Sequence, residues 1–259
     1  MIPRATICGI LIIMPDWQAE AIILSVRPHG EGSAVISVLT ADYGRHAGLV
    51  RGGASSRMRG ITQPGNRVRV SWRARLSEQL GQMQIELVQS VPALLLDSPL
   101  RLSGVASMCA LLDGALPERE AQPGLFEGSA ALLDVIVLDD DNAGWVEGYV
   151  RWELGLLAAV GYRLDLARCI ASGLTNDLAF VSPKSGGAVA RYQAGSFASR
   201  MLALPMFLGG VSCGKHEWIA GLDLTGHFLS KRVFAAHNSD LPAQRKRLAD
   251  MVYSRYNGK

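Results

Sequence analysis

Cysteine is scarce and widely spaced in this 259-residue sequence. The four cysteines, Cys8, Cys109, Cys169 and Cys213, form no CxxC pair. A secreted chain held together by disulfides would carry a denser set. The spacing therefore favours reduced, mostly buried thiols in a cytoplasmic protein.

Long hydrophobic runs are also missing. An apolar run near the N-terminus, residues 7–14, is too short to span a bilayer. No small-x-small cleavage site follows it, because Pro15 and Asp16 come next. We expect no membrane segment. We also expect Met14 to be the natural start and the preceding residues to be an extension, with a disordered tail over residues 1–14 as the alternative.

Signatures of catalysis are sparse. There is no GxxxxGK[ST] phosphate-binding loop and no HExxH motif, and the five histidines are scattered. Asp139, Asp140 and Asp141 are adjacent, but three acids ahead of a predicted helix are typical of a solvated loop, where negative charge suits the helix dipole. We predict no catalytic residue, no metal site and no cofactor.

Acidic residues are unevenly distributed, although the net charge is only +3. Residues 1–90 hold ten arginines against six acids, and residues 91–150 hold two arginines against ten acids. The remaining residues hold fourteen lysines and arginines against seven acids. Because electrostatic footprints act locally, this segregation says more about partners than the net charge does.

Two kinds of periodicity divide the chain near residue 92. Five short strand-like runs with turn signals between them cover residues 20–26, 33–40, 46–51, 67–76 and 82–89. Five strands in about seventy residues favour a small closed barrel, and the OB-fold is the commonest of that size. Helical spacing then covers residues 99–116, 125–138, 145–160, 199–208, 217–235 and 242–253, with Gly161 as a stop signal. We predict a mixed α+β fold: an OB-fold domain over residues 15–91 and a mostly helical domain over residues 92–259.

An acid-free, arginine-rich stretch lies in the first domain. Between Tyr43 and Ser77 there is no Asp or Glu, and there are eight arginines: Arg45, Arg51, Arg57, Arg59, Arg67, Arg69, Arg73 and Arg75. Strand alternation places the last four on one face and Val68, Val70, Trp72 and Ala74 on the other. Arginine pairs well with phosphate, so we expect this face to bind DNA.

Other interpretations of this stretch stay open. It is either a nucleic-acid site or a solvated face that keeps the protein in solution, and an anionic membrane is a weaker third choice. Tyr43 is either a base-stacking residue or a structural turn residue. Trp72 should point into the core, so single strands would be held chiefly through their backbone.

The C-terminal helices carry a second basic group. Lys231, Arg232, Arg245, Lys246 and Arg247 form either a solvated helix face or a further contact for DNA or for an acidic partner tail. Such a tail with an apolar end would need a hydrophobic groove beside the basic rim. Phe228, Leu229, Val233 and Phe234 are candidates for that groove, although core packing is the simpler role for them.

Several stretches together resemble the bacterial RecO family. They are AIILSVRPHGEGSAVISVLTADYGRHAGLVRGG (21–53), PGNRVRVSWRARL (64–76), YVRWELGLLAAVGYRLDLARC (149–169) and DLAFVSPKSGGAV (177–189). The resemblance covers roughly residues 15–255, and its specificity lies in the order of the motifs rather than in any one of them.

The resemblance implies a recombination mediator in DNA repair, without enzymatic activity. Such proteins bind single- and double-stranded DNA, anneal complementary strands and help load RecA on gapped DNA. They work with RecR and often RecF, and they contact the C-terminal tail of single-stranded DNA-binding protein. The resemblance thus implies a cytoplasmic, nucleoid-associated protein of the RecFOR pathway. The alternative is an adaptor that docks an acidic partner tail, with DNA contact incidental.

One feature departs from the family pattern. Some members hold zinc with two CxxC pairs, whereas here Cys169 is followed by Ser172, and Ala190 and Gln193 occupy the second pair. One thiolate cannot supply four ligands. We therefore predict a degenerate, zinc-less loop at about residues 165–195, held by packing and hydrogen bonds.

Overall fold

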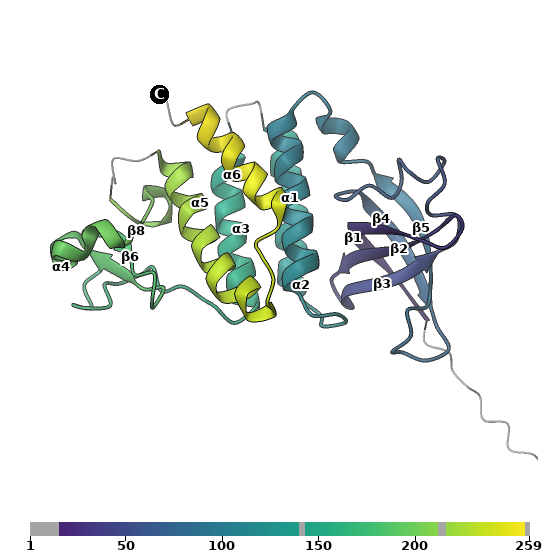
Figure 1. Cartoon of the computed structure of the whole chain (residues 1–259), viewed down its shortest axis with the longest axis horizontal. Helices are drawn as coiled ribbons and strands as arrows, with labels where there is room; N and C mark the ends of the chain where they lie inside the picture. Colours follow the sequence, from purple (N-terminus) through teal and green to yellow (C-terminus); the bar gives the residue numbers. More distant parts are fainter. Residues whose placement is uncertain (1–15, 140–142, 212–215, 257–259) are drawn as a thin grey trace, which may run out of the picture.

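The computed structural model describes residues 16–139, 143–211 and 216–256. Three parts follow one another along the long axis: a β-barrel, a layer of helices and a small sheet (Figure 1). The expected extension at residues 1–14 and the expected start at Met14 lie outside the described residues. No helix within the described ranges has the length and apolar character needed to cross a bilayer.

The barrel confirms the predicted OB-type fold. Its strands are β1 (Asp16–His29), β2 (Ser33–Thr40), β3 (Gly44–Val50), β4 (Arg67–Arg73) and β5 (Gln82–Gln89). They close in the order β1-β2-β3-β5-β4, with β3 parallel to β5 and the other pairs antiparallel. Closure therefore gives each of these strands a neighbour on both sides.

The middle of β1 is buried on both faces, which explains why its sequence does not alternate. Ile23 belongs to the barrel interior, together with Val38 and Val70. Ile22 and Leu24 instead join the core of the helical part, against α1 (Pro99–Ala115). β1 therefore contributes to two cores, one inside the barrel and one between the outer face of the barrel and the helices.

Five α-helices form the centre of the molecule. Besides α1 they are α2 (Pro123–Leu138), α3 (Trp145–Ala159), α5 (Glu217–Phe228) and α6 (Ala243–Tyr256), with a 3-10 turn η1 (Pro92–Leu95) leading in from the barrel. Gly161 follows α3 at φ +89°, as its stop signal predicted. The helix expected at 217–235 is shorter than predicted, because α5 gives way to the π-helical η4 (Leu229–Phe234) and the 3-10 turn η5 (Ala235–His237).

The small sheet occupies the end opposite the barrel (Figure 1). It consists of β6 (Leu178–Val181), β7 (Ala188–Ala190) and β8 (Leu202–Ala203), with α4 (Arg191–Ala194) and the 3-10 turns η2 (Gly195–Arg200) and η3 (Met206–Leu208). The helix predicted at 199–208 is therefore wrong. Leu202 and Ala203 pair with β6, and Pro205 lacks the N–H that a helix interior needs.

Candidate nucleic-acid interface and partner groove

The alternation predicted for β4 is confirmed. Val68, Val70, Trp72 and Ala74 are buried in the barrel, while Arg69, Arg73 and Arg75 are exposed on the outer surface. Trp72 also donates its indole N–H to the Leu80 carbonyl at 2.9 Å, which fixes it as a core residue.

Acidic neighbours reach the arginine strand from the two strands beside it. Arg69 lies between Glu20 of β1 and Glu86 of β5, and it pairs with Glu86 at 3.7 Å. Arg73 lies opposite Asp16. An acid-free sequence is thus not an acid-free surface, because sheet pairing brings in residues from distant parts of the chain.

Two of the eight arginines hold the barrel against the helices. Arg67 donates to the Ala130 carbonyl at 2.6 Å and to the Asp134 carboxylate at 2.7 Å, both on α2. Arg45 donates to the Leu116 carbonyl at 2.8 Å and lies 3.4 Å from Glu118. Their guanidinium groups already have partners within the chain.

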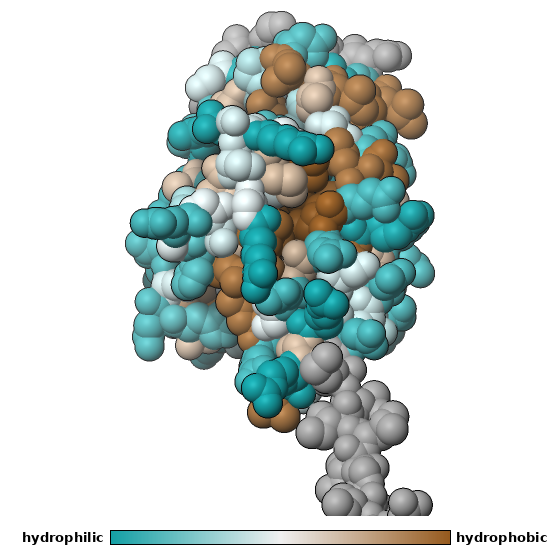
Figure 2. Space-filling view, turned by 90° about the vertical axis from the view of Figure 1, so that its right-hand side faces the viewer, coloured by the Kyte–Doolittle hydropathy of each residue, from teal (hydrophilic) through white to brown (hydrophobic). Residues whose placement is uncertain are grey.

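The remaining arginines are exposed on the barrel and the β3–β4 connection. Arg51, Arg57, Arg59, Arg73 and Arg75 form no ion pair with a described residue. Asn66 holds the connection in shape, because its side-chain amide donates to the carbonyls of Gly60 and Ile61, each at 2.8 Å. Figure 2, which looks onto the barrel end, shows long hydrophilic side chains spread over this face with apolar surface between them.

An aromatic cluster that sequence reasoning missed closes one end of the barrel. Trp17 stacks on Tyr43 with ring centroids 4.4 Å apart, and it also lies 5.7 Å from Trp72. His46 meets both tryptophans edge-on. Burial, assisted by the positive charge of Arg119, lowers the pKa of His46 to about 4, so the ring is neutral at neutral pH. The sequence did not predict the role of Trp17, because the apolar run that indicated the strand begins at residue 20, whereas β1 already begins at Asp16.

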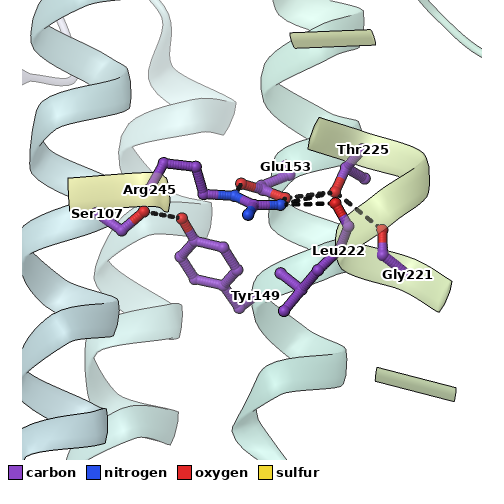
Figure 3. A network of polar contacts seen from close by, with 7 residues as sticks. All are labelled: Ser107, Tyr149, Glu153, Gly221, Leu222, Thr225 and Arg245. Atoms are coloured by element: carbon purple, nitrogen blue, oxygen red, sulfur yellow. Dashed lines mark hydrogen bonds and ion pairs between the residues drawn. The ribbon is translucent and has the colours of Figure 1, made fainter. Parts of the chain in front are cut away.

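One of the five basic residues predicted to form a surface group near the C-terminus is buried. Lys231, Arg232, Lys246 and Arg247 are exposed, but Arg245 is buried, with 2% of its surface accessible. Its guanidinium binds both carboxylate oxygens of Glu153, at 2.5 and 3.0 Å (Figure 3). Arg245 is therefore a core residue and cannot contact DNA or a partner. The sequence did not predict this role, because the residues next to Arg245 are polar and made it look like part of an exposed helix face.

The buried ion pair belongs to a network that joins the three helices α3, α5 and α6. The Thr225 hydroxyl on α5 donates to Glu153 of α3 at 2.5 Å, and Arg245 of α6 also donates to the Leu222 carbonyl at 2.9 Å. Close by, the hydroxyls of Ser107 on α1 and Tyr149 on α3 lie 2.6 Å apart (Figure 3). Burial disfavours a charged Arg245, but the Glu153 carboxylate outweighs it and raises the pKa of Arg245 above its ordinary value.

The apolar residues considered for a partner groove are all in the core. Phe228, Leu229, Val233 and Phe234 are each at most 2% exposed. A groove of about 640 Å³ lies instead between α2 and α3. Leucine, valine and tryptophan side chains line it, and Arg151 and Arg163 flank it. Four glycines, 124, 128, 148 and 155, keep it open, since a Cβ on any of them would meet nothing closer than 3.9 Å.

Hydrogen bonds surround the thiol of Cys169 in the loop that leads to the small sheet. Cys169 is buried, and its Sγ accepts the Ala190 backbone N–H at 3.3 Å. Burial opposes ionisation of this thiol, but hydrogen bonds from Ser172 and from the Ala190 backbone outweigh it and lower the pKa of Cys169 to about 7. The described residues contain no cluster of His, Cys, Asp and Glu that could hold a metal ion.

The fold defines a two-part α+β class: an OB-type barrel joined through a shared core to a helical domain. Two family models match the chain, described as Recombination protein O N terminal over residues 14–91 and Recombination protein O C terminal over residues 96–241. The chain is 49% identical to the DNA repair protein RecO of Rhodospirillum centenum, over 91% of this chain and 94% of the relative. It is 45% identical to RecO of a Jannaschia species (92% and 96% covered) and 44% identical to that of Gluconacetobacter diazotrophicus (92% and 95% covered).

The chain therefore belongs to the RecO family of DNA repair proteins. This membership makes it a recombination mediator and not an enzyme.

Proposed function

We propose that this protein binds single- and double-stranded DNA through the barrel and anneals complementary strands in the bacterial cytoplasm, at the nucleoid. The observation that carries the proposal is the group of five exposed arginines without an ion-pair partner among the described residues: Arg51, Arg57, Arg59, Arg73 and Arg75. Arg51 and Arg73 border the same hollow, and Met58 lines it between Arg57 and Arg59. These charges are thus gathered on one part of the barrel.

Annealing requires no covalent chemistry. Two DNA strands repel each other through their phosphates, and guanidinium groups that pair with phosphates on both strands reduce that repulsion. Base pairing then supplies the sequence specificity, because phosphate contacts read no bases. The same activity would serve to load RecA on gapped DNA together with RecR, and with RecF where RecF takes part.

The test is a salt series of fluorescence anisotropy with a labelled single strand. We expect wild type to bind with a steep salt slope, and Arg51/Arg59/Arg73→Glu to lose most of its affinity. A charge-matched control is Arg168/Lys184/Arg200→Glu, which reverses three exposed charges near the small sheet, outside both groups of candidate DNA contacts. Equal loss in both variants would mean that overall charge, and not the barrel, drives binding.

The groove between α2 and α3 favours a second function, that of an adaptor. An acidic peptide with an apolar end fits it, because the apolar end would fill the open groove while the exposed Arg163 beside it meets the acids. The C-terminal tail of single-stranded DNA-binding protein has this chemistry, so we propose that this tail docks here. This site lies on the helical part and would act alongside the barrel.

Filling the groove tests this second function. A Cβ added at Gly155 would have open space around it, with no neighbouring atom within 4 Å, so Gly155→Leu should fold normally and occupy the groove. We expect a labelled acidic peptide with an apolar C-terminus to lose at least tenfold in affinity, about 1.4 kcal/mol. Ser254→Leu, on the exposed side of α6, is the control. Unchanged peptide binding in Gly155→Leu would exclude this groove as the docking site.

A further inference from the structure

The β3–β4 connection, residues 51–66, is attached to the barrel at both ends although it forms no helix or strand. Near its start the Ala54 N–H donates to the Gly32 carbonyl of the β1–β2 turn at 3.2 Å. At its end the Ile23 N–H donates to the Asn66 carbonyl at 3.0 Å, which extends the pairing of β1 with β4 by one residue. The connection is therefore held against the barrel and is not a free arm.

The middle of the connection is a compact turn that packs on the barrel core. Met58 lies against the apolar residues of the barrel interior. Its carbonyl accepts the Thr62 hydroxyl at 3.0 Å and the backbone N–H groups of Ile61 and Thr62, each at 2.9 Å. Arg57 and Arg59, on either side of Met58, are exposed. One apolar side chain thus fixes a turn that presents two arginines to solvent.

Asn66 holds this turn from within the barrel end. It has no exposed surface, and its side-chain amide donates to the carbonyls of Gly60 and Ile61, each at 2.8 Å. Both donors of one side chain therefore fix the two residues that follow Arg59. Because Asn66 is fully buried, it cannot touch DNA, and it can affect binding only through the residues that it holds.

A fixed connection matters because of what it carries. Three of the five exposed arginines without an ion-pair partner among the described residues lie on it: Arg51, Arg57 and Arg59. A flexible arm would lose conformational freedom when it settled on the phosphates, and that loss would weaken binding. A loop that is already ordered in the free protein loses less, so the same phosphate contacts give a higher affinity.

We propose that Asn66 is a positioning residue for DNA binding, which keeps the β3–β4 connection as a preformed loop that presents Arg57 and Arg59 to the phosphates of a DNA strand. This inference rests on the proposed DNA binding and deepens it. It assigns the role to a buried, uncharged side chain that a search for basic residues would pass over.

The test is a salt series of anisotropy with a labelled single strand. Asn66→Ala keeps every arginine, so we expect about tenfold weaker binding at each salt concentration, with a salt slope close to that of wild type. Arg59→Ala should instead lower the slope by about 0.7, the loss of one phosphate contact. Asn176→Ala, at an exposed asparagine near the small sheet, is the control and should bind as wild type does.

Trypsin reports the state of the connection directly, because it cleaves after arginine and requires backbone that can leave its folded position. We expect wild type to resist cleavage at Arg57 and Arg59, and Asn66→Ala to be cut there first, as identified by mass spectrometry. Thr62→Val is a milder variant that removes only the hydroxyl bond to Met58. It should show both changes to a smaller extent, and it serves as the test if Asn66→Ala does not fold.

Gly60→Ala offers a rescue that a merely structural role of Asn66 would not produce. A Cβ at Gly60 would meet no atom within 4 Å, and its φ is not positive, so alanine suits the folded loop. Alanine also restricts a loosened chain more than glycine does. We expect Asn66→Ala/Gly60→Ala to recover at least twofold in affinity over Asn66→Ala, together with part of the resistance to trypsin.

The possible results are distinguishable. If trypsin cut the connection in Asn66→Ala while the affinity for DNA stayed that of wild type, DNA binding would stand and the positioning role would be overturned. A loss of affinity without any cleavage of the connection would also overturn it. If wild type itself bound no DNA, the proposed function and this inference would fail together.

Discussion

His46 is a buried polar residue whose ring nitrogens both lack a hydrogen-bond partner among the described residues. It is held by ring contacts with Trp17 and Trp72. Such a site tolerates a neutral imidazole and disfavours the charged form, because a buried cation loses its hydration. The barrel is therefore sensitive to acid at this position.

Stability should fall as the pH drops below 6.5. The pKa of His46 is lowered to about 4 in the folded state, so between these values the unfolded chain binds a proton that the folded chain does not. From pH 7 to pH 5 this costs about 2 kcal/mol of unfolding free energy. We expect His46→Leu to remove this part of the pH dependence, as measured by urea unfolding at both pH values. Parallel pH curves for wild type and variant would contradict the assignment.

The roles of single residues were the hardest part to predict from the sequence. Alternation along β4 correctly separated core from surface, because it depends only on local strand geometry. Arg67 and Arg245 were not predictable in this way. The first is drawn toward α2 and the second toward Glu153, and both partners lie far away in sequence. When a charged residue pairs with a residue far away in the sequence, the residues next to it in the sequence do not indicate the pairing.

At the scale of elements, periodicity predicted the five strands and the five α-helices of the centre, since each has one or two buried faces. It failed at residues 199–208, where Leu202 and Ala203 complete a sheet that exists only through tertiary pairing. The degenerate loop near Cys169 was predicted by resemblance alone. The groove between α2 and α3 was not predicted, because its glycines are conspicuous only once the two helices are side by side.

Glu153 of α3 and Arg245 of α6 form a buried ion pair between two helices. Removing one partner leaves a buried charge without compensation, which costs about 3–5 kcal/mol. We expect Arg245→Met to destabilise the protein by that amount, and Glu153→Leu/Arg245→Met to recover much of the loss, as measured by chemical denaturation. Arg69→Met is the control, because the exposed Arg69–Glu86 pair should contribute less than about 1 kcal/mol. A double variant as unstable as Arg245→Met would show that the ion pair itself, and not the avoidance of an unpaired charge, stabilises the helices.

At the scale of the whole molecule, the barrel and the helices behave as one body because they share a core and a set of polar contacts. Ile22, Leu24 and Leu39 of the barrel pack in the helical core. Arg27 and Arg45 both reach Asp113 of α1, at 3.1 and 3.6 Å, and the Arg119 N–H donates to the Arg45 carbonyl at 2.7 Å. Arg67 adds its contacts to α2. We expect the two parts to unfold in a single transition.

Arg67 and Arg73 lie on the same strand, and substitutions at them can distinguish the contact between barrel and helices from DNA binding. Both are arginines on the outer face of β4, but Arg67 donates to Ala130 and Asp134, whereas Arg73 is exposed and borders the hollow. Arg67→Ala should lose charge-assisted hydrogen bonds and cost about 1.5–3 kcal/mol of unfolding free energy, with little change in affinity for single strands. Arg73→Ala should change stability by less than about 0.5 kcal/mol and lower the salt slope of binding by about 0.7, the loss of one phosphate contact. Calorimetry and salt-dependent anisotropy on the same two variants measure both quantities. If Arg67→Ala lowered the salt slope as Arg73→Ala does, the barrel–helix contact would itself be part of the DNA site, and DNA would have to displace α2 from the barrel in order to bind.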